Sequence, residues 1–266
     1  MNIFLRELRA YRKSVLIWAL SLSLLSVIFL MLFPAFTKDT LASQKVIEHF
    51  PLAIRQALDI SLQYFFTIYG FFAYLLTFVG LAGAVQAMNI GVGIISKEVS
   101  GKTADFLLTK PVSRAAVITS KLLAAFGLIL ITNIVFSLVS LVAANIISTT
   151  KFDNNIFALT SATMFLIQIF FLALGILTSV IIPKIKSAIS VSLPVVFSFF
   201  IIGTLGVILG NDIVKYVSPF KFFDTNYIIS HKSYDPKYLM IEAVFIVVAI
   251  AISYIVYTKK DVKAAV

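Results

Sequence analysis

The feature that most constrains this chain is a series of six apolar runs, each about as long as the roughly 20 residues that a helix needs to cross a bilayer. They cover residues 14–36, 64–95, 122–148, 156–182, 188–209 and 239–257. Inside hydrocarbon, a helix is the form in which such a segment satisfies its own backbone groups. The runs are too long, and alternate too little, to be barrel strands of about 10 residues. The sequence therefore predicts an all-α, polytopic membrane protein with six transmembrane helices in one domain, 1–266.

The distribution of basic residues predicts the orientation of these helices. The chain has 22 Lys and Arg against 12 Asp and Glu, a formal charge of +10. Of the 22 basic residues, 14 fall in the segments 1–13, 96–121, 183–187 and 258–266, together with only four acids. Because basic residues accumulate on the cytoplasmic side, both termini are predicted to be cytoplasmic, and 37–63 and 210–238 extracellular. The same charges are too dispersed for a nucleic-acid site, which needs one clustered basic face.

The N-terminal arm, residues 1–13, allows two interpretations. An interfacial helix would place Phe4 and its apolar neighbours Ile3 and Leu8 in the headgroup layer and the basic residues in water. A plain basic flank would only set the topology. The residues at issue are Phe4, Arg6, Arg9 and Arg12.

Several function classes are excluded by what the sequence lacks. It has no Cys, and five of the six runs have no Asp, Glu, Lys, Arg or His. Ion-coupled transport and intramembrane proteolysis both need such groups inside the membrane. The stretch Gly101-Lys102-Thr103 matches half of a phosphate-binding loop, but Ser96 replaces its first glycine and no α/β domain surrounds it. We therefore expect no catalytic residue, no metal site and no cofactor in this chain.

The segment between the second and third runs, 96–121, contains an apolar patch that a simple connecting loop would not need. Phe106, Leu107 and Leu108 form an apolar patch between charged residues, and Pro111 should end any helix there. An exposed apolar patch of this kind needs a surface to dock against, either the membrane or a partner protein.

The same segment carries a family resemblance. Glu98, Gly101, Thr103, Leu107-Leu108, Pro111-Val112 and Arg114, followed by Lys121, resemble the signature of ABC-2-type permeases, the membrane subunits of a class of ATP-binding-cassette exporters. The stretch Ser218-Pro-Phe-Lys221-Phe-Phe-Asp224 is similar to a motif before the last span in the subfamily of peptide-antibiotic and toxin exporters.

The resemblance implies a permease that dimerises, most simply as a homodimer, and binds a separate cytoplasmic ATPase, which would hold the ATP and Mg²⁺. The segment 96–121 would contain the coupling helix that fits a cleft of the ATPase, and the arm 1–13 would also touch that subunit. The implied coupling residues are Glu98, Gly101, Phe106, Leu107, Leu108, Pro111 and Arg114. For Arg114 and Lys121 the alternative is that they only extend toward lipid headgroups.

Polar residues within the spans have two interpretations as well. Gln86, Asn89, Asn133 and Gln168 could line a substrate cavity, or they could form hydrogen bonds between helices, which is the more frequent use of such groups. In the first extracellular segment, apolar spacing predicts a helix over 46–62 that starts at Pro51, with Arg55 and Asp59 as an i, i+4 ion pair.

The leading hypothesis is thus a plasma-membrane permease of an exporter for an amphipathic or apolar substrate, such as a peptide antibiotic, a toxin or a lipid-like compound, with a role in antibiotic resistance. It would not be an enzyme. The alternative is a membrane anchor or regulatory scaffold that recruits a cytoplasmic partner without transport. An ion channel is less consistent with the sequence, since no run has a polar stripe to line a pore.

Overall fold

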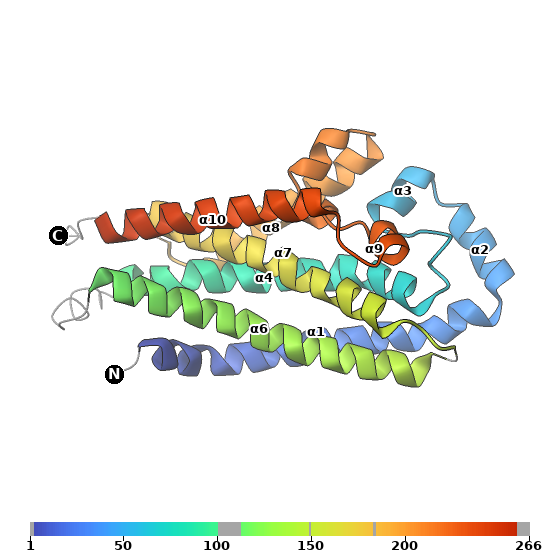
Figure 1. Cartoon of the computed structure of the whole chain (residues 1–266), viewed down its shortest axis with the longest axis horizontal. Helices are drawn as coiled ribbons and strands as arrows, with labels where there is room; N and C mark the ends of the chain where they lie inside the picture. Colours follow the sequence, from blue (N-terminus) through green and yellow to red (C-terminus); the bar gives the residue numbers. More distant parts are fainter. Residues whose placement is uncertain (1–2, 101–112, 149, 183–184, 260–266) are drawn as a thin grey trace.

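The computed structural model describes the backbone of residues 3–100, 113–148, 150–182 and 185–259; the side chains of 98–100 and 212 are not described. Six long helices lie side by side along the longest axis of the molecule (Figure 1). They are α1 (Ile3–Lys38), α4 (Ile68–Ser100), α6 (Arg114–Ile147), α7 (Asn154–Ile181), α8 (Ala188–Ile208) and α10 (Pro236–Lys259). All six are long and apolar enough to cross a membrane, which confirms the predicted all-α fold with six spans.

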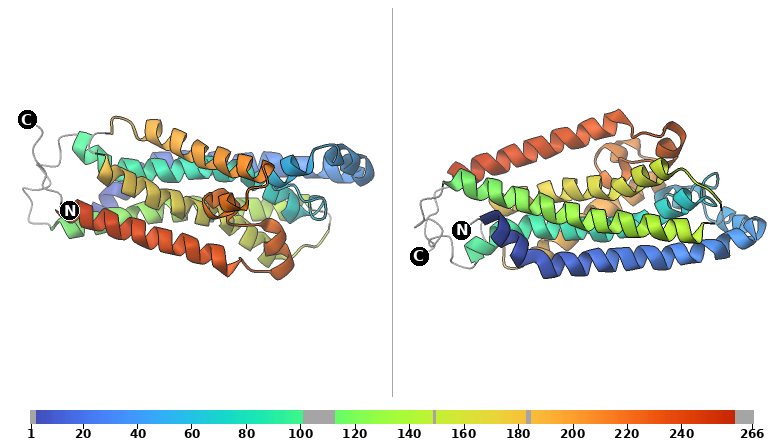
Figure 2. Two further views of the ribbon diagram at one scale, coloured as in Figure 1. Left: turned by 90° about the horizontal axis from the view of Figure 1, so that it is seen from above. Right: turned by 60° about the horizontal axis from the view of Figure 1, so that its bottom comes forward.

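The bundle has two ends, a terminal end and a distal end. At the terminal end, α1, α6 and α8 begin and α4, α7 and α10 end. At the distal end lie the short elements α2 (Thr40–Glu48), α3 (Leu52–Ala57), η1 (Asp212–Tyr216), η2 (Pro219–Lys221) and α9 (Thr225–His231). The connections between successive long helices therefore alternate between the two ends, as Figure 2 shows in two further views.

Two of the long helices extend well beyond the predicted runs. α1 starts at Ile3, so the arm and the first span are one helix of 36 residues, about 54 Å long at 1.5 Å per residue. α6 starts at Arg114, where the predicted run starts at 122, and the Ser113 hydroxyl caps it by accepting the Ala116 N–H at 3.2 Å. The helix α6 thus starts before the apolar run because its first turn is capped and its inner face is buried against other helices.

The centre of the bundle is the pair α4 and α7, the two most buried of the six spans. They approach closely because Gly91 of α4 and Gly175 of α7 meet at their crossing. A methyl group on Gly91 would lie 2.5 Å from the Leu172 carbonyl oxygen, and one on Gly175 would lie 2.6 Å from the Met88 carbonyl oxygen. Small residues that let two backbones approach are typical of helix packing in membranes.

The outer helices present aliphatic side chains outward. α8 and α10 are the least buried spans, and α1 and α6 each bury one face against the other. Exposed residues such as Leu20, Ile134, Leu205 and Val247 are what a lipid-facing surface requires.

The distal segment after α1 differs in part from its prediction. Two short helices, α2 and α3, replace the single helix over 46–62, although Pro51 does precede the start of α3 as predicted. The predicted Arg55–Asp59 pair is wrong. α3 ends at Ala57, and Asp59 lies beyond it with a left-handed φ of 57°, so the two residues do not share a helix face. The Ile60 N–H bonds the Arg55 carbonyl at 2.8 Å, which closes the helix end around Asp59.

Candidate functional site

The terminal end contains the flanks of the predicted coupling segment. α4 ends at Ser100 and α6 begins at Arg114, so the segment leaves and re-enters the bundle at the same end. Of the predicted coupling residues, Gly101, Phe106, Leu107, Leu108 and Pro111 lie outside the described residues, as does the side chain of Glu98. Their roles therefore remain predictions. The structure describes the end of α4 and the start of α6, which lie on either side of them.

Lys121 joins three helices beside these flanks. Its side chain is only 1% exposed, and its ammonium nitrogen lies 3.3 Å from a carboxylate oxygen of Glu7 in α1. It also donates to the carbonyl oxygen of Ile94 in α4 at 2.5 Å. The interpretation that Lys121 extends toward lipid headgroups is therefore wrong, because a buried ammonium held by a carboxylate and a carbonyl is an internal tie. Through this residue the start of α6 is bonded to the arm and to the end of α4.

A second contact joins the arm to α4 in the same region. The Lys97 ammonium lies 3.9 Å from the centroid of the Tyr11 ring, within the range of a cation–π interaction. Gly93 makes room for this ring, because a methyl group there would lie 3.0 Å from the Tyr11 hydroxyl. The arm is thus fixed to the end of the helix that leads into the coupling segment.

The arm is the first part of helix α1, with an apolar side and a basic side. Phe4 and Leu8 are half-buried and pack against the main apolar cluster of the bundle, while Arg6, Arg9 and Arg12 are exposed. The first turns of α1 bend away from the axis of the rest of the helix (Figure 2, right). Because its apolar face packs on the protein, the arm is part of the bundle, and its exposed arginines are available to headgroups or to a partner.

Arg114 is half-buried at the first position of α6. The helix dipole disfavours a cation at a helix N-terminus. The stability of α6 therefore does not account for an arginine at its first position. The cap itself is supplied by Ser113.

A buried polar network crosses the middle of the bundle and joins α4, α6 and α7. Gln168 Nε2 donates to Gln86 Oε1 at 3.0 Å and to the Gly83 carbonyl at 3.1 Å. Gln86 Nε2 donates to the Thr132 hydroxyl at 2.9 Å, and Asn133 Nδ2 donates to Gln168 Oε1.

Three of the four residues proposed for a cavity therefore bond to one another, as the interhelical alternative expects, and Asn89 is half-buried on α4. That these residues line a substrate pathway stays a prediction.

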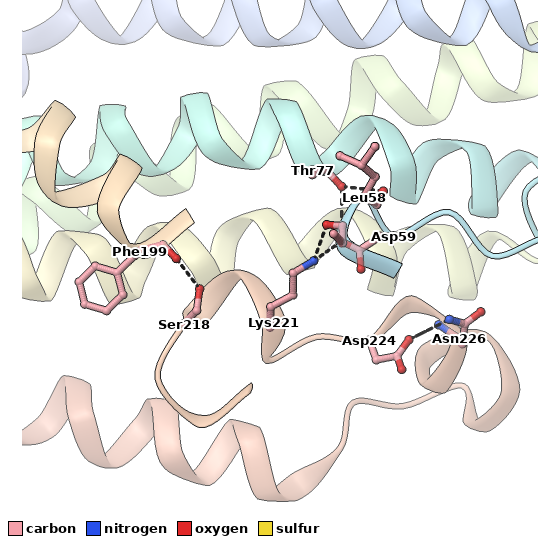
Figure 3. A network of polar contacts seen from close by, with 9 residues as sticks. Leu58, Asp59, Thr77, Phe199, Ser218, Lys221, Asp224 and Asn226 are labelled. Atoms are coloured by element: carbon pink, nitrogen blue, oxygen red, sulfur yellow. Dashed lines mark hydrogen bonds and ion pairs between the residues drawn. The ribbon is translucent and has the colours of Figure 1, made fainter. Parts of the chain in front are cut away.

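At the distal end, each polar residue of the 218–224 motif has a bonding partner (Figure 3). The Ser218 hydroxyl donates to the Phe199 carbonyl of α8 at 2.9 Å. The Lys221 ammonium donates to the Ala57 carbonyl at 2.8 Å and lies 3.5 Å from an Asp59 carboxylate oxygen. Asp224 caps α9 by accepting the Asn226 N–H at 2.8 Å. The motif therefore connects α8, the end of α3 and α9.

Beside this motif lies a pocket of about 690 Å³. Its wall includes Asp59, Lys221, Phe222, Tyr227 and Tyr238, from both distal segments. Burial raises the pKa of the Asp59 carboxyl, the charge of Lys221 lowers it, and nearby Asp224 raises it again.

Three functional features lie beyond what the sequence patterns indicated. Glu7 gave no signal in a basic arm, although it is the partner of Lys121 from 114 positions away. Thr132 is one of many hydroxyl residues in the spans. Its role as the acceptor of the Gln86 amide is visible only once α4 is packed on α6. The motif at 218–224 was found by resemblance, but its link to Asp59 depends on tertiary structure.

The fold defines a multi-pass membrane protein in which Lys121 bonds α6 to α1 and α4 at the terminal end. The family model for the ABC-2 family transporter protein matches residues 1–262. The chain belongs to this family, and it is therefore a membrane permease of an ABC transporter, a class located in bacteria in the plasma membrane. The predicted family membership is confirmed. The comparison with curated proteins finds no match.

Proposed function

We propose that this permease forms a homodimer, binds a cytoplasmic ATPase through the segment 96–121, and exports an amphipathic or apolar substrate. Family membership implies an ATP-binding partner subunit in general. ATP and Mg²⁺ would be bound and ATP hydrolysed on that partner, and this chain would change conformation in response.

The observation that carries the coupling proposal is the position of Lys121. It bonds Glu7 of the arm and the Ile94 carbonyl of α4, so the two helices that flank the coupling segment and the arm are one bonded unit. A push on the segment would therefore displace α1, α4 and α6 together. The apolar residues Phe106 to Leu108 would supply the contact with the ATPase, and Arg114 with Glu98 would fix its register by charge-assisted hydrogen bonds.

The proposed substrate class is supported by the centre of the bundle around Gln86 and Gln168, apart from the two ionisable side chains, Lys121 and Glu242, that the described bundle also buries. α7 and α8 contain no Asp, Glu, Lys, Arg or His, and neither does α4 between Ile68 and Ile95. The polar groups at the centre are neutral amides and hydroxyls that bond to one another. A charged cargo would lack counter-charges there, whereas an apolar or amphipathic cargo such as a peptide antibiotic, a toxin or a lipid-like compound would not need them.

The test is a pull-down of the tagged chain in mild detergent, comparing the native chain with Phe106→Asp plus Leu107→Asp. A cassette-type ATPase should co-purify with the native chain and be lost from this variant. The matched control is Leu41→Asp plus Val46→Asp, which places the same charges on exposed residues of α2 at the distal end and should retain the ATPase.

Retention of the ATPase by the coupling variant would refute the assignment of 96–121. An ATPase that binds but whose rate does not respond to any lipid-soluble compound would favour the scaffold alternative.

A further inference from the structure

Glu242 is a carboxylate buried within the sixth span, and no interaction described above uses it. It is the seventh residue of α10 and is only 2% exposed. Neither of its carboxylate oxygens has a hydrogen-bond partner among the described residues. Burying a charge without a partner is costly, and an ionisable residue inside a membrane span typically marks a functional site. The position therefore indicates a partner that comes from outside the chain.

Glu242 lies on the side of α10 that packs on α7. It is three residues from Phe245, so the two side chains share one side of the helix. Phe245 stacks on Phe170 of α7, with ring centroids 4.1 Å apart. Just before α10 starts, the Tyr234 hydroxyl donates to the Leu159 carbonyl of α7 at 2.5 Å. Glu242 lies between these two contacts, where α10 runs along α7 (Figure 1).

The bundle offers Glu242 no described counter-charge. α7 contains no Lys, Arg or His. Three lysines of the neighbouring distal segment bond other groups: Lys221 bonds Asp59, Lys232 bonds Asp153 and Lys237 bonds the Tyr216 hydroxyl. The helix dipole of α10 stabilises an anion only within about the first turn, and Glu242 lies beyond it.

Aromatic rings lie on either side of Glu242 along the same side of α10. Tyr238 precedes it by four residues and Phe245 follows it by three. A carboxylate among aromatic rings suits an organic cation, because the carboxylate supplies the charge and the ring faces attract the cation. The Tyr238 ring already faces one cation, since the Lys237 ammonium lies 5.9 Å from its centroid and 4.4 Å from that of Tyr216.

The distal pocket of about 690 Å³ approaches the same side of α10. Tyr234 and Tyr238 belong to its wall, and Tyr238 is about 6 Å from Glu242 along the helix axis at 1.5 Å per residue. The wall contains three acidic and three basic residues, so it has no net charge that would exclude a cation. A molecule with its apolar part in this pocket can extend a cationic group to Glu242 once the side chains that cover the carboxylate rearrange.

We infer that Glu242 binds the positively charged group of an amphipathic organic cation, such as an ammonium, a phosphonium or a guanidinium. This inference rests on the proposed function, because it narrows the charge class of the amphipathic substrate. The carboxylate supplies the single counter-charge, and the rings of Tyr238 and Phe245 contact the apolar groups around the cation.

The test is equilibrium binding of tetraphenylphosphonium, an apolar organic cation, to the purified full chain in mild detergent. Glu242→Gln keeps the shape of the side chain and removes its charge. It should weaken binding about tenfold or more, because truncating one partner of a buried charge pair is costly. Triphenylphosphine oxide, a neutral compound that also carries phenyl groups, should bind the native chain and this variant equally.

The matched control for charge is Glu48→Gln, which removes an exposed distal carboxylate that bonds Gln44 and should leave the affinity unchanged. Tyr238→Leu should weaken binding of the cation about threefold, whereas Tyr238→Phe keeps the ring and should bind like the native chain. Thermal unfolding shows whether each variant is folded. The cation should raise the unfolding midpoint of the native chain more than that of Glu242→Gln.

The second part of the test uses the co-purified complex with its ATPase. Tetraphenylphosphonium should change the rate of ATP hydrolysis of the native complex at concentrations about tenfold lower than for Glu242→Gln. If the native chain does not bind the cation, or binds it no better than Glu242→Gln, the site is overturned.

Binding that depends on Glu242 but leaves the rate of ATP hydrolysis unchanged would overturn its role in recognising the substrate. Failure of the proposed function is seen separately, as the absence of any ATPase in the complex, because the binding measurement needs this chain alone.

Discussion

Gly91 of α4 and Gly175 of α7 face each other where the two central helices cross, and neither position has room for a side chain. The contacts are reciprocal, because a methyl group on either glycine would meet backbone atoms of the other helix. Backbone cannot move aside as a flexible side chain can, so the separation of the central pair is set at this point.

Gly91→Ala and Gly175→Ala should each destabilise the bundle by about 1–3 kcal/mol, the usual cost of overpacking a core. Gly80→Ala is the matched control on α4, since a methyl group there meets only Ile167 Cδ1 at 3.8 Å. It should be neutral or slightly stabilising, because alanine favours a helix over glycine. Thermal unfolding of the purified chain in detergent gives the comparison. Equal losses in all three variants would show that the crossing does not control the spacing.

The buried amide network predicts a second effect. Gln168→Leu leaves Gln86 and Asn133 without a shared partner and should cost about 1–2 kcal/mol, near the upper values for polar contacts in membranes. Asn145→Leu is the control, because that amide is exposed and, within the described part of the chain, bonds the Leu141 carbonyl of its own helix. It should change the unfolding free energy little. If both variants behave alike, interhelical bonding by Gln168 contributes nothing.

Lys121 predicts a third effect at the terminal end. Lys121→Met should lower the unfolding free energy by about 2–3 kcal/mol, since Glu7 and the Ile94 carbonyl both lose a buried donor. Lys232→Met, which removes an exposed lysine from a distal ion pair, should have no measurable effect. If Lys121→Met also unfolds like the native chain, the three-helix tie is not a stabilising contact.

The same tie has a functional consequence. In Lys121→Met the coupling segment is no longer bonded through α6 to the arm, so less of the ATPase should co-purify than with the native chain, at a temperature where both are folded. Lys121→Arg should retain most of it, because a guanidinium can still bond Glu7. If as much ATPase co-purifies with Lys121→Met as with the native chain, the contacts of Lys121 are not needed for binding the partner.

The six spans could be predicted because each is a long apolar run, a property of consecutive residues. The helix α6 starts at Arg114, before the predicted apolar run, because Ser113 caps it there and the side chain of Lys121 is buried. Lys121 itself was open to a lipid-facing interpretation, since its partner Glu7 is distant in sequence.

In the distal segment after α1, the residue spacing predicted an ion pair that the described structure does not form. Arg55 and Asp59 have helical spacing, but the helix ends between them and Asp59 turns to Lys221, 162 positions away. Spacing predicts a pair only where the helix continues, and the end of α3 is set by a left-handed residue that the sequence does not mark.

In the function proposed above, the coupling segment at the terminal end contacts the ATPase. The most direct measurement is photocrosslinking in intact membranes from a photoreactive phenylalanine analogue placed at Leu107, and separately at Leu41 on α2 at the distal end. We expect a crosslink to a cassette-type ATPase from position 107 and none from position 41. A crosslink from position 41, or from neither position when the ATPase is present, would contradict it.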